Sequence, residues 1–180
     1  MLEKIKKYLS FYNKKQFFVR VIILASTLLL LLAFFLPFAS AESEWKELLQ
    51  EYGKRVVDKE SGFTGNALIH ITLLEFMKIH IYDNSYDGYV LIIVLIIIVA
   101  ILTLLIALLS GLKKEVPVIV LTIINLLVLF LLKFDFTDRG LIGYNYNLGI
   151  GYYFYLIFSL VLIGGIIAMK VLKLIDKKKC

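Results

Sequence analysis

Long apolar stretches separated by polar segments set the pattern of this chain. Two of them, residues 89–109 and 116–132, contain no charged residue and flank a short polar segment at 110–115. About 20 apolar residues suffice to cross the hydrocarbon core of a bilayer, and a backbone in lipid must satisfy its own hydrogen bonds. The pattern therefore predicts a hairpin of two transmembrane helices with a loop over residues 110–115.

A further apolar stretch lies near the end of the chain. Residues 150–172 are apolar, follow a polar loop at 133–149, and precede a basic tail at 173–180. Tyrosines cluster at the start of this stretch, where an interfacial aromatic belt is expected. We therefore predict that residues 150–172 form the last transmembrane helix.

The first apolar stretch, within residues 21–41, is open to two interpretations. Ala39-Ser40-Ala41 has the small-x-small pattern of a signal peptidase site, which would make the stretch a cleaved signal peptide. The apolar run from residue 21 to residue 38 is longer than the roughly 7–15 residues of an ordinary signal peptide core, which favours a retained helix. We expect retention, and either outcome places residue 42 on the outer side of the membrane.

The basic lead at residues 1–20 also has two interpretations. It carries several lysines and Arg20 against the single acid Glu3, and Leu2, Ile5 and Leu9 recur at helical spacing. It is either an amphipathic helix along the inner membrane surface or a solvated positive tail.

Residues 42–88 form the longest polar segment and contain a helical pattern. Ser43 is the expected N-cap of this helix. Charged residues occupy the other positions around an apolar helix face formed by Trp45, Leu48, Leu49, Tyr52 and Val56. An amphipathic helix presents anchors at this spacing, so we name these five residues as a candidate partner-binding surface.

The second half of this outer segment is ambiguous. After a turn at residues 61–66, we expect a helix over residues 67–82, although Ile69, Ile71 and Leu73 alternate as in a strand. The pattern as a whole predicts an all-α integral membrane protein: a four-transmembrane-helix bundle with a mostly helical outer segment between spans 1 and 2. Composition agrees, because 61% of the 180 residues are hydrophobic and the mean hydropathy is +0.88.

The distribution of charge predicts the orientation. Most of the 20 lysines and arginines lie in residues 1–20, in the 110–115 loop and in the tail from Lys170, which together hold only Glu3, Glu115 and Asp176 of the 14 acids. Cytoplasmic segments of membrane proteins carry the excess of basic residues. We therefore expect a protein of the bacterial plasma membrane with both termini on the cytoplasmic side. The lysines and arginines that give the net charge of +6 cluster where the spans end, and this placement argues against nucleic acid as a partner.

The predicted spans contain little that could carry ions. Apart from Lys170 near the end of the last span, no charged side chain lies inside them, which argues against a proton-coupled transporter or a charged-filter channel. Asn125 is expected to hydrogen-bond a neighbouring helix, a contribution of about 1 kcal/mol. Two stripes of small residues would let helices approach closely: Ala100, Thr103, Ala107 and Gly111, and Gly164 with Ala168. We expect these contacts within one chain rather than between two copies.

No enzymatic or metal-binding motif is visible. His70 and His80 flank Glu75, but helical spacings of five and ten do not place them on one face, and two histidines make a poor zinc set. Neither a phosphate-binding glycine motif nor a nucleophile–base arrangement occurs, so we expect no catalytic residue and no cofactor.

Three short motifs carry a family resemblance: Phe35-Leu36-Pro37-Phe38, Ser61-Gly62-Phe63, and Gly149-Ile150-Gly151-Tyr152-Tyr153. They resemble small four-span membrane proteins of low-GC Gram-positive bacteria. The resemblance implies a bacterial four-span architecture and carries over no functional residue.

Three functions fit these features. The leading hypothesis is a non-enzymatic plasma-membrane protein whose extracellular segment binds another membrane or extracellular protein, as an accessory subunit or a sensor. The first alternative is an immunity protein against a membrane-active bacteriocin or toxin. The second is a homo-oligomeric membrane-permeabilising effector, for which the small-residue stripes are the support.

Overall fold

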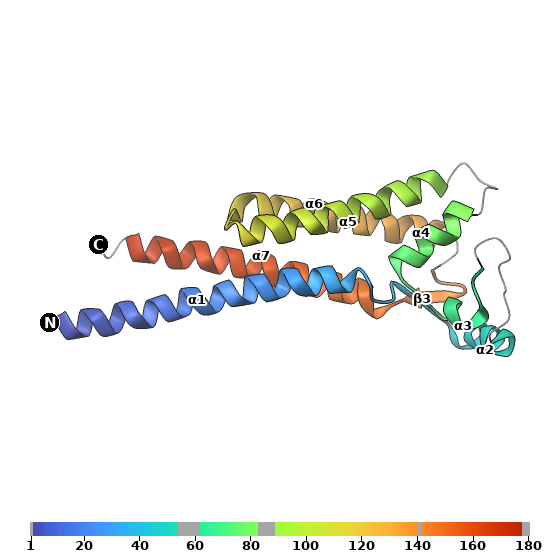
Figure 1. The fold of residues 1–180 in the computed structure, drawn as a ribbon, viewed down its shortest axis with the longest axis horizontal. Helices are drawn as coiled ribbons and strands as arrows, with labels where there is room; N and C mark the ends of the chain where they lie inside the picture. Colours follow the sequence, from blue (N-terminus) through green and yellow to red (C-terminus); the bar gives the residue numbers. More distant parts are fainter. Residues whose placement is uncertain (1, 54–61, 83–88, 140–141, 178–180) are drawn as a thin grey trace.

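The computed structural model describes residues 2–53, 62–82, 89–139 and 142–177 (Figure 1). Along the chain, its elements are α1 (Leu2–Ala33), β1 (Ala39–Ala41), α2 (Ser43–Tyr52), α3 (Gly65–Leu68), β2 (His70–Ile71), α4 (Leu73–Tyr82), α5 (Tyr89–Gly111), α6 (Glu115–Asp138), β3 (Tyr146–Leu148) and α7 (Ile150–Lys177).

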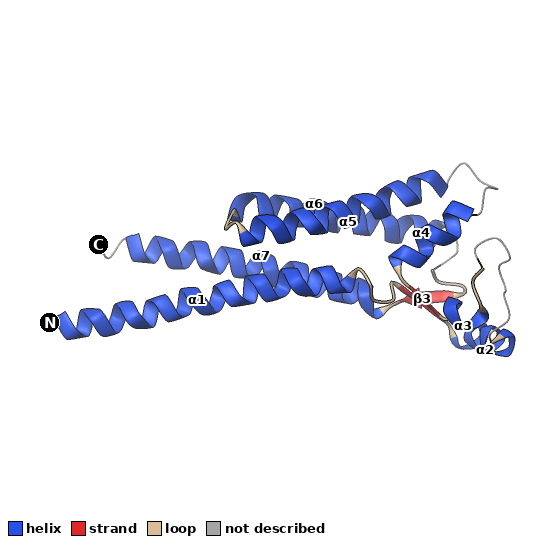
Figure 2. Cartoon of the chain, viewed as in Figure 1, coloured by secondary structure: helices blue, strands red, loops and turns tan. Residues whose placement is uncertain are grey.

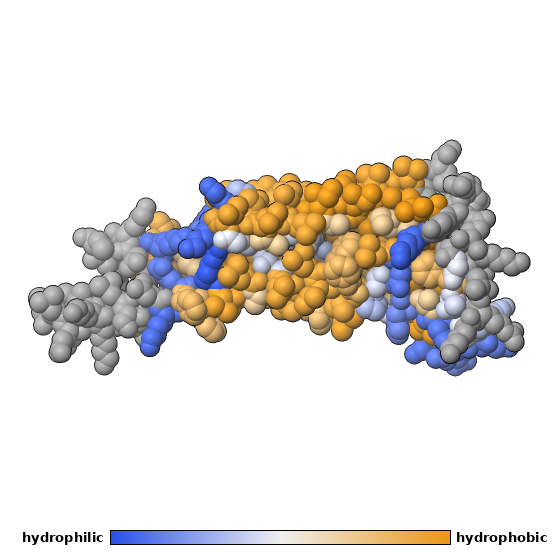
Figure 3. Space-filling model, in the orientation of Figure 1, coloured by the Kyte–Doolittle hydropathy of each residue, from blue (hydrophilic) through white to orange (hydrophobic). Residues whose placement is uncertain are grey.

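Four of the helices are long and apolar enough to cross a membrane. Their candidate spans are Lys14–Ala33, Val90–Gly111, Glu115–Asp138 and Ile150–Ile175. Apolar residues cover the middle of the molecule, and hydrophilic residues gather towards its two ends (Figure 3). The prediction of four apolar helices in a bundle is therefore confirmed.

The bundle consists of two helix pairs. Helix α1 packs along α7, and α5 packs along α6, with further contacts from α1 to α5 and from α6 to α7. Both chain ends and the turn between α5 and α6 lie at one end of the bundle, which we call the tip end (Figures 1 and 2). The three strands and helices α2, α3 and α4 lie at the other end, and we call them the cap.

Helix α1 differs from the separate lead and span expected from the sequence. It runs without a break from Leu2 to Ala33, so residues 1–20 form no distinct surface helix in the described part of this segment. The stretch contains neither glycine nor proline, and nothing in the backbone interrupts the helical hydrogen bonds. A charged first half and an apolar second half therefore share one helix.

Helix α6 is longer than the predicted span at 116–132. It continues to Asp138, so the first part of the expected loop at 133–149 is helical. The extension buries Phe136 completely, and Arg139 forms an i,i+4 ion pair with Asp135 at 2.8 Å just beyond that contact. The extra length thus brings Phe136 into apolar contact with Phe76 of the cap.

The predominantly helical structure agrees with the predicted all-α bundle, to which a small antiparallel sheet is added. Its strand order is β2-β1-β3, and Ala39 pairs with Ile71 on one side and with Leu148 on the other. The candidate signal peptidase site, Ala39-Ser40-Ala41, is thus the central strand, and Ala39 is fully buried. These strands are too short to produce a recognisable alternation in the sequence.

The single helix predicted over residues 67–82 is instead three elements, α3, β2 and α4. The break comes at Thr72, which forms a capping box: the Glu75 amide donates to Thr72 Oγ1 at 3.2 Å, and the Thr72 amide donates to Glu75 Oε2 at 2.8 Å. Ile69, Ile71 and Leu73 are all buried, but only Ile71 of the three lies in a strand. Helix α2 also begins differently, because its N-cap is Glu42 and not Ser43.

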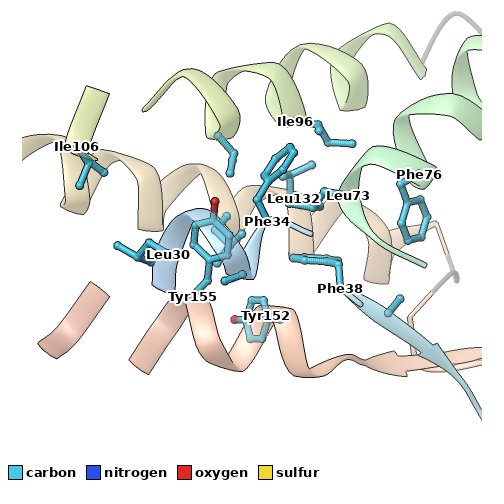
Figure 4. Close-up of a cluster of buried hydrophobic side chains, with 14 of the residues drawn as sticks. Leu30, Phe34, Phe38, Leu73, Phe76, Ile96, Ile106, Leu132, Tyr152 and Tyr155 are labelled. Atoms are coloured by element: carbon cyan, nitrogen blue, oxygen red, sulfur yellow. The ribbon is translucent and has the colours of Figure 1, made fainter. Parts of the chain in front are cut away.

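Aromatic side chains join the cap to the bundle. Phe76 of α4 stacks on Phe136 of α6, with ring centroids 4.5 Å apart. Phe38, just before β1, contacts Phe136 and Tyr152 edge-on at 5.7 Å each. Figure 4 shows Phe38, Phe76 and Tyr152 in the same apolar cluster as Phe34 and Leu132. The cap and the bundle thus share one apolar core.

Candidate functional site

The candidate partner-binding surface divides into a buried and an exposed part. Leu49 is completely buried and Trp45 is half-buried, whereas Leu48 and Tyr52 keep 42% and 45% of their surface exposed. Val56 lies outside the described residues. Leu49 therefore belongs to the core of the cap, and only the neighbouring positions are available to a partner.

Helix α3 covers Leu49 through a close backbone approach. A Cβ atom on Gly65 would lie 2.3 Å from the Leu49 carbonyl oxygen, so this contact requires glycine. The Asn66 amide donates to the Gly53 carbonyl at 2.9 Å, and Thr64 caps α3 by accepting from the Ala67 amide at 3.4 Å. In the sequence, this contact lies within the turn predicted at residues 61–66.

Trp45 lies beside Tyr146, a residue for which the sequence pattern predicts no role. The Tyr146 hydroxyl donates to the Leu68 carbonyl at 2.9 Å and so ties β3 to α3. Burial raises the pKa of the Tyr146 phenol, and the nearby indole N–H of Trp45 offsets part of that rise. That indole N–H nevertheless falls short of hydrogen-bond geometry and has no partner among the described residues.

A groove runs between the start of α2 and the turn before β3. It has a volume of about 230 Å³ and is lined by Trp45, Leu48, Tyr144, Asn145, Glu42 and Glu44. Tyr144 is 80% exposed at its edge. The Glu42 amide donates to the Asn145 carbonyl at 2.9 Å, which holds the two walls together. The groove therefore combines aromatic and aliphatic side chains with two carboxylates.

The bundle interior contains a hydrogen-bonded polar cluster at Thr103 of α5. Its hydroxyl donates to the Val99 carbonyl at 2.7 Å and accepts from Asn125 Nδ2 of α6 at 3.1 Å. The Tyr155 hydroxyl of α7 lies 2.8 Å from the same oxygen. Thr103 thus serves as a polar junction of three helices, a role that its small size alone did not indicate.

The other predicted packing residues differ in position. Ala100 and Ala107 are half-buried, whereas Gly111, Gly164 and Ala168 are exposed. A Cβ on Gly111 or Gly164 would meet nothing within 4 Å, so these two glycines mediate no close approach among the described residues. The close contact falls one position later, at Gly165, where a Cβ would lie 3.1 Å from Ile23 of α1. The rotation of α7 about its axis determines which of two adjacent glycines faces α1. The spacing of small residues along one helix does not reveal that rotation.

The candidate metal ligands do not converge in the described part of the chain. His70 Nδ1 lies 3.1 Å from Ser40 Oγ across two strands, and Glu75 caps α4. The side chain of His80 lies outside the described residues. No group of three histidine, cysteine, aspartate or glutamate side chains within the described ranges could hold a metal ion.

Comparison with known protein families, with curated proteins and with solved structures finds no match to this chain. Any function is therefore inferred from the geometry of the chain itself.

Proposed function

We propose that this chain is a non-enzymatic, multi-pass protein of a bacterial plasma membrane whose cap faces outward and binds a protein partner, as an accessory subunit or a sensor. Four apolar helices and the concentration of basic residues at the tip end support this orientation. In it, both termini and the turn between α5 and α6 are cytoplasmic.

The observation that carries the proposal is the composition of the groove, together with the backbone hydrogen bond that joins its two walls. Leu48 and Tyr144 project beside the half-buried Trp45, and tryptophan and tyrosine are the residue types that dominate binding energy in protein interfaces. The sheet and the shared core fix the groove before binding, which lowers the entropic cost of association.

The charge around the groove indicates the partner's chemistry. Glu42 and Glu44 line it, and Glu47 and Glu51 lie exposed further along α2. A negative rim raises the association rate with a positive surface and disfavours acidic partners. We therefore expect a partner segment that offers an apolar anchor beside lysine or arginine.

Site-specific photocrosslinking tests this proposal. A photoreactive amino acid at Tyr144 should give a discrete adduct in native membranes. Leu48→Ala should abolish that adduct, because it removes the adjacent wall of the groove. Ile81→Ala provides the control, since Ile81 is 49% exposed, close to the 42% of Leu48, but lies on α4. Absence of an adduct at Tyr144, or an adduct that is indifferent to Leu48→Ala, would contradict the proposal.

A further inference from the structure

A second pocket lies at the tip end, opposite the cap. It has a volume of about 300 Å³ and is formed by α1, the turn between α5 and α6, and α7. Arg20, Lys113 and Lys173 line it together with a single carboxylate, Glu115. Three cations from three separate segments therefore converge on one cavity with an excess of positive charge.

Two of these charged groups also hold the walls in place. The Arg20 guanidinium donates to the Ser110 carbonyl and, at 3.4 Å, to the Gly111 carbonyl, so it caps the end of α5. A guanidinium has five N–H donors, and further donors remain for a ligand. Lys173 forms an ion pair with Glu115, which links α7 to α6.

Lys113 is held in a conformation that favours glycine. Its φ is 59°, and it is the only non-glycine residue with positive φ among the described residues. The Lys114 amide donates to the Leu109 carbonyl at 3.0 Å and the Lys113 amide to the Ser110 carbonyl at 3.2 Å, which is a Schellman motif with lysine in the position that glycine usually occupies. Such backbone strain concentrates at binding sites. A lysine here directs its side chain to the pocket at a cost that glycine would avoid.

The surroundings of the pocket are apolar on one side. Phe17 lines it and is 72% exposed, and the buried Met169 forms part of the wall. In Figure 3, hydrophilic residues at this end directly adjoin the apolar band. The pocket thus offers positive charge beside a surface that suits acyl chains.

We propose that this pocket binds a phosphate group, carried by the headgroup of an anionic phospholipid. Basic pockets between the cytoplasmic ends of membrane helices recognise such headgroups. Arg20 and Lys113 contact the phosphate oxygens, and Lys173 balances Glu115 at the rim. The site is independent of the cap and of the partner proposed for it.

The test uses the purified full-length chain in neutral detergent. Phosphatidylglycerol should raise the melting temperature in a saturable manner, and phosphatidylcholine with the same acyl chains should not. Lys113→Gln should weaken the apparent affinity for phosphatidylglycerol about fivefold, the equivalent of about 1 kcal/mol for one cation. Lys46→Gln, an exposed lysine on α2, provides the control with the same charge change and should bind as the wild type does.

Lys113→Gly separates binding from folding. Glycine suits the positive φ, so this variant should melt at or above the wild-type temperature without lipid, yet bind phosphatidylglycerol as weakly as Lys113→Gln. Inorganic phosphate added alone identifies the source of the ligand. If phosphatidylglycerol stabilises the protein and inorganic phosphate does not, the result supports a site for a lipid headgroup. If inorganic phosphate stabilises the protein equally, the result supports a phosphate site whose ligand is a soluble anion. Wild-type affinity in both Lys113 variants, or equal stabilisation by phosphatidylcholine, would overturn the proposal.

Discussion

The hydroxyl oxygen of Thr103 lies 2.8 Å from the hydroxyl oxygen of Tyr155 in the centre of the bundle. Because Thr103 gives its single proton to the Val99 carbonyl, the Tyr155 phenol must be the donor in this pair. The same threonine oxygen also accepts from Asn125, so one atom joins α5, α6 and α7. The helices are therefore held in register by a polar contact inside a largely apolar core.

Thr103→Val should destabilise the bundle by about 1–2 kcal/mol, since it removes two interhelical hydrogen bonds and leaves their donors buried. Thr122→Val is the matched control. Thr122 is equally buried, but its hydroxyl donates only to the Val118 carbonyl of its own helix. Chemical unfolding of both variants in detergent measures the difference. Equal losses would show that the Thr103 cluster contributes nothing specific.

Gly149→Ala should destabilise the junction between cap and bundle. An added Cβ would lie 2.2 Å from the Pro37 carbonyl oxygen, where the Gly149 amide already donates to the Phe38 carbonyl at 2.7 Å. We expect a loss of about 1–3 kcal/mol from this overpacking. Gly164→Ala should instead be neutral or gain up to about 1 kcal/mol, because that helical position is open. Thermal unfolding of the two variants distinguishes them, and an unchanged melting temperature for Gly149→Ala would refute the close approach.

The first helix should be retained in the mature protein. Cleavage after Ala41 would sever the central strand from α2 and remove α1, whose Ile23 and Leu30 are fully buried. Intact mass spectrometry of the membrane-extracted protein should therefore give about 20.7 kDa. A species that begins at Glu42 would contradict this expectation.

The sequence was informative about the bundle and much less so about the cap. Hydropathy over some 20 residues predicts each span, because a whole helix contributes to the signal. The sheet pairs Ala39 with residues as distant as Leu148, and its strands have two or three residues, so no local pattern reveals it. Its geometry depends on tertiary contacts that become visible only in the folded chain.

Some missed features nevertheless had a local signal. Thr72-Leu73-Leu74-Glu75 is a capping-box sequence, which would have placed the start of α4 correctly. The burial of Leu49 could not be inferred in the same way. An amphipathic helix has the same sequence pattern whether its apolar face packs against a partner protein or against α3. Candidate binding residues on such a helix therefore include core positions that only the structure separates.

Tyr146→Phe should lower the stability of the cap by about 1 kcal/mol at neutral pH, because the bond to the Leu68 carbonyl is lost. The folded-state pKa of Tyr146 is raised, so its contribution is complete below the ordinary tyrosine pKa of about 10 and is lost as pH rises above it. The stability gap between wild type and Tyr146→Phe should consequently narrow in strongly alkaline buffer. Tyr144→Phe, at an exposed neighbouring tyrosine, should leave neutral-pH stability unchanged. A gap that stays constant with pH would contradict the burial of the phenol.

In the proposed orientation, the cap faces outward and the tip end faces the cytoplasm. Cys180 is the only cysteine in the sequence, so labelling of intact cells with a membrane-impermeant maleimide reports one position at a time. Wild-type protein should react at Cys180 only after the membrane is permeabilised, whereas Tyr144→Cys in a Cys180→Ser background should react in intact cells. Labelling of Cys180 in intact cells, or protection of position 144, would contradict the proposed orientation.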